Sequence, residues 1–327
     1  MRDTIIFGNG LGMALDPNYF RLMPAMENAW SDSNCLDDNQ RRLIQNCLQA
    51  QGAGDKPIGE PDLDILHMAV NACDFLDTVA NDDDGWLTDD GKEFPLASRR
   101  YLTNVAWYFH RHHHVLPESF LEPLFAFIKE TKSHVTTLNY DNLMYQKMIE
   151  ADILNGFTSG YLVDGFPDSG FQDENLKRKF GNNFGYYLHL HGTPLFIEQN
   201  GIIKKQSQRT PQEIPTKHLV LSHVRHKRTI IDASPVLSTY WKFFTLALRE
   251  SSNIFIFGYS GLDKHLNELI ANQASGKNIQ VIEWSGAGKQ NERERFWKTA
   301  FGNDFESIEL TLTQLDNILE FTEWTRN

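Results

Sequence analysis

Three polar side chains that can perform acid–base and electrostatic chemistry follow directly after two apolar runs of the chain. Asn139 and Asp141 follow the run 134–138, and His191 follows the run 186–190. A histidine, with an unperturbed pKa of about 6.5, can act as a general base near neutral pH. A fixed carboxylate or amide dipole can stabilise positive charge that develops on a substrate. Taken singly, Asn139 and Asp141 are also explained as turn and helix-capping residues, and His191 as a core histidine.

Two glycine-rich turns also follow apolar runs. The first comes after the run 4–7 and contains Gly8, Asn9, Gly10 and Gly12. The second contains Gly258 and comes after the run 253–257, the clearest buried strand of the chain. Glycines let backbone N–H groups approach the pyrophosphate of a nucleotide at the N-terminus of a helix. A tight turn without a ligand is the alternative, because the first turn lacks the third glycine of a full GxGxxG motif.

The order of apolar runs, turns and periodic segments predicts an α/β fold. Several strands end at polar or glycine turns and lead into helices, which is typical of a Rossmann-like, doubly wound parallel sheet. The carboxyl ends of such strands share one edge, and ligands bind there. The stretch 16–132 has helical periodicity and no convincing strand. We therefore expect one domain over 1–327 that contains a mostly helical insertion over 16–132.

The same patterns predict the individual elements. Helices are expected over 38–51, 62–79, 96–114, 117–131, 142–149, 235–249 and 292–299, from a start near 263, and at the C-terminus. Further strands are expected over 279–282 and 307–312, with a short one over 217–222, and 155–183 and 201–215 are expected to be loops.

Composition and charge limit the classes of function. The net charge of -12 argues against broad binding to nucleic acid or to an anionic membrane. Hydrophobic residues make up 41% of the chain, which is enough for a sizeable core. Cys35, Cys47 and Cys73 form no CxxC pair, so neither a disulfide framework nor a cysteine zinc ribbon is expected. With no signal peptide and no apolar run long enough to span a bilayer, we expect a cytoplasmic protein.

Two clusters of basic residues have less specific explanations. His110, His113 and His114 would share one face of a helix, a spacing that can suit zinc. No carboxylate lies at a supporting position and Pro117 ends the helix, so a solvated helix end is favoured and no metal is expected. The basic run 225–228 is expected to be a solvated loop or to meet ligand phosphates.

The set and order of these motifs resemble the sirtuin superfamily. Sirtuins carry a glycine-rich first turn, a Gln-Asn-Ile-Asp segment, a His-Gly pair and a late Gly-Thr/Ser turn. The corresponding segments here are Gly8–Gly12, Leu138-Asn139-Tyr140-Asp141, His191-Gly192 and Gly258-Tyr259-Ser260. The amino-acid sequences of these segments are closer to those of the divergent sirtuin-like proteins of bacterial anti-phage defence than to those of protein deacetylases. The four-cysteine zinc module is missing, and Asp16–Arg21 is at best a remnant of the Gly-Ile-Pro-Asp-Phe-Arg loop.

The resemblance implies an NAD glycohydrolase, for which NAD is the substrate and the products are nicotinamide and ADP-ribose or a cyclised form. It implies that Asn139 holds the ribose next to the nicotinamide or positions a water, and that Asp141 contacts this ribose or the nicotinamide amide. It also implies that His191 is the general base. Ser260 and Glu283 are expected on the adenosine side. Binding of the nucleotide is expected to involve Gly8, Asn9, Gly10, Gly12, Gly258, Ser260 and Glu283.

Constant destruction of NAD would harm the host cell, so the same resemblance implies gated activity in abortive-infection defence. Gating is expected through homo-oligomerisation or an activating partner protein, with the helical insertion as the natural surface. Three alternatives stay open: a non-catalytic NAD or ADP-ribose sensor, a sirtuin-type deacylase or ADP-ribosyltransferase, and a nicotinamide dehydrogenase.

Overall fold

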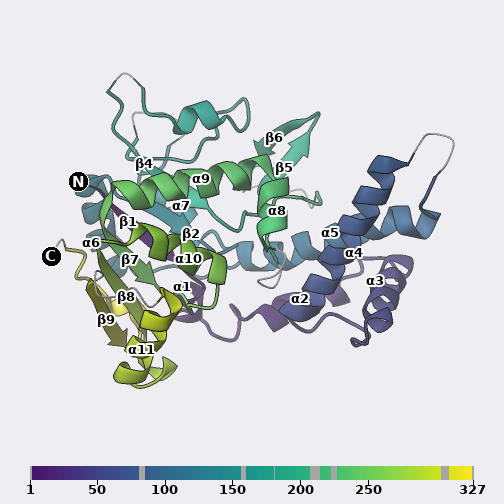
Figure 1. The fold of residues 1–327 in the computed structure, drawn as a ribbon, viewed down its shortest axis with the longest axis horizontal. Helices are drawn as coiled ribbons and strands as arrows, with labels where there is room; N and C mark the ends of the chain where they lie inside the picture. The colour runs from purple at the N-terminus through teal and green to yellow at the C-terminus, as the bar shows by residue number, and fades with distance from the viewer. Residues whose placement is uncertain are drawn as a thin grey trace.

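A seven-stranded parallel sheet forms the centre of the protein, as the sequence predicts (Figure 1). The computed structural model describes residues 2–80, 85–155, 160–179, 181–206, 214–221, 227–302 and 309–325. The strand order is β3-β4-β2-β1-β7-β8-β9. The strands are β1 (Arg2–Phe7), β2 (His134–Thr137), β3 (Leu162–Val163), β4 (Gly185–His189), β7 (Ser251–Phe257), β8 (Asn278–Trp284) and β9 (Glu309–Leu315).

Helices cover both faces of this sheet, because successive strand side chains point to opposite sides. Ile5 and Phe7 belong to one apolar core and Ile6 to the other. The Ile6 core includes residues of α8 (Lys227–Ala233), α9 (Pro235–Glu250), α10 (Lys264–Gln273) and α11 (Gln290–Ala300). The Phe7 core includes residues of α1 (Gly10–Met13), α6 (Glu118–Thr131), α7 (Leu143–Glu150) and the 3-10 turn η4 (Ile318–Glu320).

The strand order reverses at β1. The chain places β2, β4 and β3 on one side of β1, then returns to add β7, β8 and β9 on the other side. In an open α/β sheet this reversal opens a crevice beyond the carboxyl ends of the strands. The turns that follow β1 and β7 therefore lie where a ligand is expected.

Four helices between β1 and β2 extend to one side of the sheet (Figure 1). They are α2 (Leu22–Ser31), α3 (Asp38–Ala50), α4 (Glu60–Val79) and α5 (Asp89–His110), and they pack mainly on one another. In contrast, α6 lies on the sheet, where the rings of Phe120 and Phe257 are 5.2 Å apart. Among the described residues of 16–132 there is no strand, as predicted. No described helix is long and apolar enough to cross a membrane.

Two segments predicted to be loops contain strands. The 155–183 segment holds the two-residue edge strand β3 and the 3-10 turn η1 (Asp173–Leu176). The 201–215 segment begins with β6 (Ile202–Lys205), which pairs antiparallel with β5 (Phe196–Gln199). Asn200 and Gly201 join these strands with φ of 54° and 73°. An Asn-Gly pair with positive φ is a strong hairpin signal, and the prediction overlooked it.

Three other predicted elements are wrong. In place of the C-terminal helix there is only η4, where the Asn317 side chain caps a tight turn. The apolar side chains that follow are buried without forming a longer helix: Ile318, Leu319, Phe321 and Trp324. The described part of 217–222 forms a single bridge between Leu219 and Gly192. The helix α5 ends at His110 and not at His114, so the three histidines do not share a helical face.

Candidate functional site

The ends of β1, β2 and β7 are tied together by hydrogen bonds at the carboxyl edge of the sheet. Asn139 is 5% exposed, and its Nδ2 donates to the Gly8 carbonyl at 3.0 Å. The backbone N–H of Gly10 donates to the Gly258 carbonyl at 2.7 Å. The structure thus brings Asn139 and both predicted glycine turns to one place.

The glycines of these turns are required by the contact between the turns themselves. A Cβ atom on Gly10 would lie 2.6 Å from Gly258 Cα, and Gly258 has a φ of +61°. The N–H of Gly8 donates to Phe257 O at 2.9 Å, and that of Gly10 donates to Gly258 O. In this arrangement neither N–H is available to a pyrophosphate. Of the predicted residues in this turn, Asn9 is exposed and Gly12 is buried beneath the ring of Phe20.

His191 has a carboxylate partner that the sequence analysis did not identify. Its Nε2 lies 3.2 Å from Asp263 Oδ2, and the same oxygen accepts from Lys227 Nζ at 3.0 Å. All three residues are at most 9% exposed. The prediction treated Asp263 only as the start of a helix, and it is indeed the N-cap of α10, since its Oδ1 accepts from the Leu266 N–H at 3.2 Å.

Burial and the nearby charge of Lys227 lower the pKa of His191, although Asp263 and the Leu138 backbone act in the opposite direction. The imidazole is therefore mainly neutral at neutral pH. Burial alone would raise the pKa of Asp263, but the hydrogen bonds and charges of His191 and Lys227 outweigh it and hold that pKa well below its ordinary value. The pair thus combines a neutral base with an ionised carboxylate that orients it.

A hydroxyl group holds the Asp263 turn in place. Tyr259 accepts the Asp263 N–H on its hydroxyl oxygen at 2.7 Å and donates to Asn267 Oδ1 at 3.0 Å. Asn267 Nδ2 in turn donates to the Gly261 carbonyl at 2.7 Å. These bonds fix the backbone between β7 and α10, and they leave the carboxylate of Asp263 facing His191.

Gly192 allows another segment of the backbone, at His218, to pack closely against the turn after β4. It has a φ of +79°, and a Cβ there would come within 1.8 Å of the His218 carbonyl oxygen. The Val220 N–H donates to the carbonyl of His191 at 2.9 Å. Residues 218–220 thus lie against the turn that carries His191 and help to fix it.

Asp141 is a buried carboxyl at the end of β2. It is 7% exposed, and its Oδ1 accepts from the Leu143 N–H at 3.0 Å. Burial raises the pKa of Asp141 to about 7. The group is therefore poised between its protonated and ionised forms near neutral pH, which suits either donating or accepting a hydrogen bond.

His189 is a core residue with a structural role. Both ring nitrogens are buried without a hydrogen-bond partner among the described residues. The ring packs between Tyr145, Tyr187 and Phe196, with centroid distances of 5.0, 5.1 and 5.6 Å. Burial lowers the pKa of His189 to about 3, so the ring stays neutral.

The two residues expected on the adenosine side differ in solvent exposure and in hydrogen bonding. Ser260 is exposed at the turn after β7. Glu283 is 4% exposed, and its carboxylate accepts from Arg293 Nη2 at 2.8 Å, Trp297 Nε1 at 2.9 Å and Gln314 Nε2 at 3.0 Å. The carboxylate of Glu283 therefore links β8 to α11 and β9.

The two clusters of basic residues are only partly solvated. Lys227 of the run 225–228 is buried against Asp263, and residues 225 and 226 lie outside the described part of the chain. His114 Nε2 lies 3.2 Å from Asp16 Oδ2, and His113 is exposed. Among the described residues, no group of three or more histidine, cysteine or acidic side chains could hold a metal ion.

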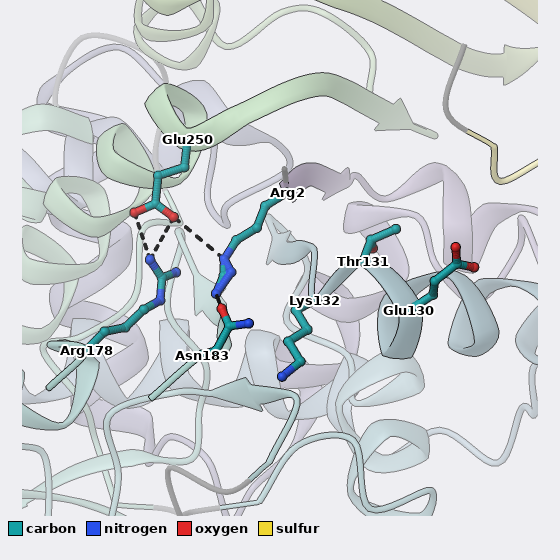
Figure 2. Close-up of a pocket in the computed structure, with 7 residues that line it drawn as sticks. All are labelled: Arg2, Glu130, Thr131, Lys132, Arg178, Asn183 and Glu250. Carbon is teal, nitrogen blue, oxygen red and sulfur yellow. Dashed lines mark hydrogen bonds and ion pairs between the residues drawn. The ribbon is translucent and has the colours of Figure 1, made fainter. Parts of the chain in front are cut away.

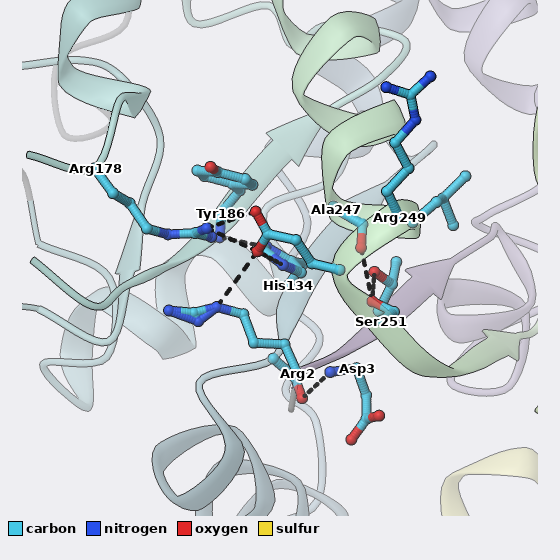
Figure 3. Close-up of polar contacts among 12 residues, drawn as sticks. Arg2, Asp3, His134, Arg178, Tyr186, Ala247, Arg249 and Ser251 are labelled. Carbon is cyan, nitrogen blue, oxygen red and sulfur yellow. Dashed lines mark hydrogen bonds and ion pairs between the residues drawn. The ribbon is translucent and has the colours of Figure 1, made fainter. Parts of the chain in front are cut away.

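A cavity of about 580 Å³ lies at the opposite edge of the sheet, near the starts of its strands (Figure 2). Glu250 accepts from Arg178 Nη1 at 2.7 and 2.8 Å, and Arg2 Nε lies 3.7 Å away. Arg2, His134 and Arg178 converge there, and Arg178 lies 4.5 Å above the Tyr186 ring (Figure 3). Most of these charges offset one another, and the N-termini of α7 and α10 point to the other edge. We therefore place the candidate site at the carboxyl edge.

We predict that Asp141→Asn stabilises the protein at high pH. The pKa of Asp141 is about 7 in the folded state against an ordinary value of 3.8. The contribution of Asp141 to the free energy of unfolding of the wild type is therefore fully present below about pH 4, and it is lost as the pH rises through 7. The neutral amide keeps the bond to Leu143 and avoids a buried charge.

The check is thermal unfolding of both proteins at pH 4, 6 and 8, with the exposed Asp168→Asn as the control. The melting temperature of Asp141→Asn should exceed that of the wild type at pH 8, and the difference should vanish near pH 4. A variant that is no more stable than the wild type at pH 8 would contradict the burial argument.

A comparison with known protein families identifies the type of domain. A family model described as a SIR2-like domain matches residues 133–301, more than half of the chain. The matched segment contains Asn139, Asp141, His191, Gly258 and Asp263. No curated protein matches the chain. The extent of the family match, together with the α/β sheet, shows that the chain belongs to the SIR2-like domain family.

Proposed function

We propose that this protein is an NAD glycohydrolase that cleaves NAD to nicotinamide and ADP-ribose or a cyclised form. The observation that carries the proposal is the His191–Asp263 pair, buried at the carboxyl edge and supported by Lys227. Membership of the SIR2-like family, which implies use of NAD, provides the substrate class. Asn139 and Asp141 follow β2 at the same edge of the sheet.

In the proposed reaction the bond between the ribose carbon and the nicotinamide nitrogen breaks, and nicotinamide leaves with the bonding electrons. Positive charge develops on the ribose, as in glycoside hydrolysis. Because one amide proton of Asn139 is committed to Gly8, its amide oxygen is the group that we assign to the ribose or to the attacking water. We assign Asp141 to the amide group of the nicotinamide.

We assign His191 the role of general base. Because the ionised Asp263 accepts a hydrogen bond at Nε2, we assign Nδ1 as the nitrogen that takes the proton. The ring takes a proton from water, whose oxygen forms the new bond to the ribose carbon, or from a ribose hydroxyl in cyclisation. The pyrophosphate cannot reach the N–H groups of Gly8 and Gly10 in this arrangement. We assign to it the second amide proton of the exposed Asn9, whose Nδ2 also donates to the Phe20 carbonyl at 2.9 Å.

We also propose that the activity is gated through a second copy or an activating partner, in keeping with a role in abortive-infection defence. The helices α2–α5 support this idea because they extend away from the sheet (Figure 1), and α4 exposes apolar side chains. Met68 is 43%, Phe75 64% and Val79 38% exposed. Apolar side chains grouped on one helix are a common feature of protein interfaces.

We predict that the purified protein releases nicotinamide from NAD and that Asn139→Ala and His191→Ala reduce this by roughly 100-fold or more, the usual contribution of a positioned acid–base group. The exposed His113→Ala is the control and should keep wild-type activity. Free nicotinamide is followed by chromatography.

Equal, measurable release of nicotinamide by the wild type, Asn139→Ala and His191→Ala would overturn the catalytic assignments. Binding of ADP-ribose without turnover, even with an activating partner present, would favour the alternative of a sensor.

We predict that Asp263→Asn lowers kcat, with little change in KM, because Asp263 orients His191 and does not touch the substrate. Removal of the carboxylate takes away an interaction that raises the pKa of His191. The acid limb of the pH profile of kcat should therefore move to lower pH. The measurement is kcat between pH 5 and 8, with thermal unfolding alongside.

Because Asp263→Asn leaves Lys227 buried without its counter-charge, the double variant with Lys227→Met serves as the matched control. A loss of stability with an unmoved acid limb would show a purely structural role for Asp263.

A further inference from the structure

The last two residues of β8 point to opposite sides of the sheet. Glu283 turns inward to Arg293 and Trp297, whereas Trp284 is 60% exposed. Along a strand, Trp284 shares its side with Ile282, which belongs to the core that includes Leu11 of α1. The indole therefore lies on the side of the sheet where the first glycine turn runs into α1.

The indole of Trp284 packs against the main chain at Gly286. A Cβ on Gly286 would come within 2.3 Å of the six-membered ring, so the ring lies directly against the backbone of that glycine. Gly286 belongs to the 3-10 turn η2 (Ser285–Ala287), and Ser285 Oγ donates to Asp316 Oδ1 at 2.6 Å. One side of the ring thus has a fixed support, while 60% of the residue stays open to solvent.

This aromatic surface belongs to the same edge as the candidate site. The strand β8 neighbours β7, and the Gly258 N–H donates to the Ile282 carbonyl at 2.9 Å. Only β7 separates β8 from β1, which corresponds to roughly 10 Å at the usual strand spacing. Leu262, in the turn after β7, is another large apolar side chain left open, at 67% exposure.

We propose that Trp284 is the stacking surface for the adenine base of the nucleotide, an inference that rests on the proposed use of NAD. Every nucleobase presents a flat π face, and stacking on an aromatic side chain stabilises it without a specific hydrogen bond. The carboxylate of Glu283, expected on the adenosine side, already accepts hydrogen bonds from three side chains. Recognition by stacking also implies that other planar bases are accepted at this position.

The test is calorimetric binding of ADP-ribose, AMP and nicotinamide mononucleotide to the full chain. Trp284→Ala should weaken binding of ADP-ribose and AMP on the order of 10-fold, as loss of one stacking partner does. Trp284→Phe should restore most of that affinity. Binding of nicotinamide mononucleotide, which has no adenine, should be unchanged. In turnover of NAD, Trp284→Ala should raise KM and leave kcat unchanged.

The matched control is Trp86→Ala, because Trp86 is 59% exposed and lies just before α5, outside the sheet. Its binding of all three ligands should equal that of the wild type. Wild-type affinity of Trp284→Ala for ADP-ribose and AMP would overturn the stacking role while leaving the NAD proposal in place. Equal weakening of all three ligands would also overturn it. A wild-type protein that binds none of the three would overturn both.

Discussion

The carboxylate of Asp263 joins three segments of the chain at one buried point. One oxygen lies within 3.2 Å of both His191 Nε2, after β4, and Lys227 Nζ, at the start of α8. The other oxygen caps α10. A buried carboxylate is tolerated only with partners of this kind, and its place at a helix N-terminus is favourable in addition. The arrangement of the second half of the sheet and the orientation of the proposed base therefore depend on the same group.

The reversal of strand order explains why the remaining site residues come together. Because β2 and β7 flank β1, the turns after these strands meet, and the Gly10–Gly258 contact closes the backbone between them. Asn139 is then held by the Gly8 carbonyl. The glycines serve this packing first. In the proposed site their role is indirect, because they place Asn139 and the start of α1 at the crevice.

Much of the fold could be predicted from the sequence, because apolar runs that end in polar or glycine turns reveal both the sheet and the edge where the candidate site lies. Asp263 was missed because an aspartate before a helix is fully explained as a cap, and its partners His191 and Lys227 lie far away along the chain. For Glu283 the strand-end position was predicted, but the register that brings Arg293 and Trp297 to it was not. The short strand β3 gives too little periodicity to detect.

The central claim is that the nucleotide binds at the carboxyl edge of the sheet, with the ribose next to the nicotinamide at His191 and Asn139. The most direct measurement is a crystal structure of the protein in complex with ADP-ribose. The account predicts that this ribose lies within hydrogen-bond reach of His191 and Asn139. Nucleotide found instead in the cavity lined by Arg2, Lys132 and Arg178, at the opposite edge, would contradict it.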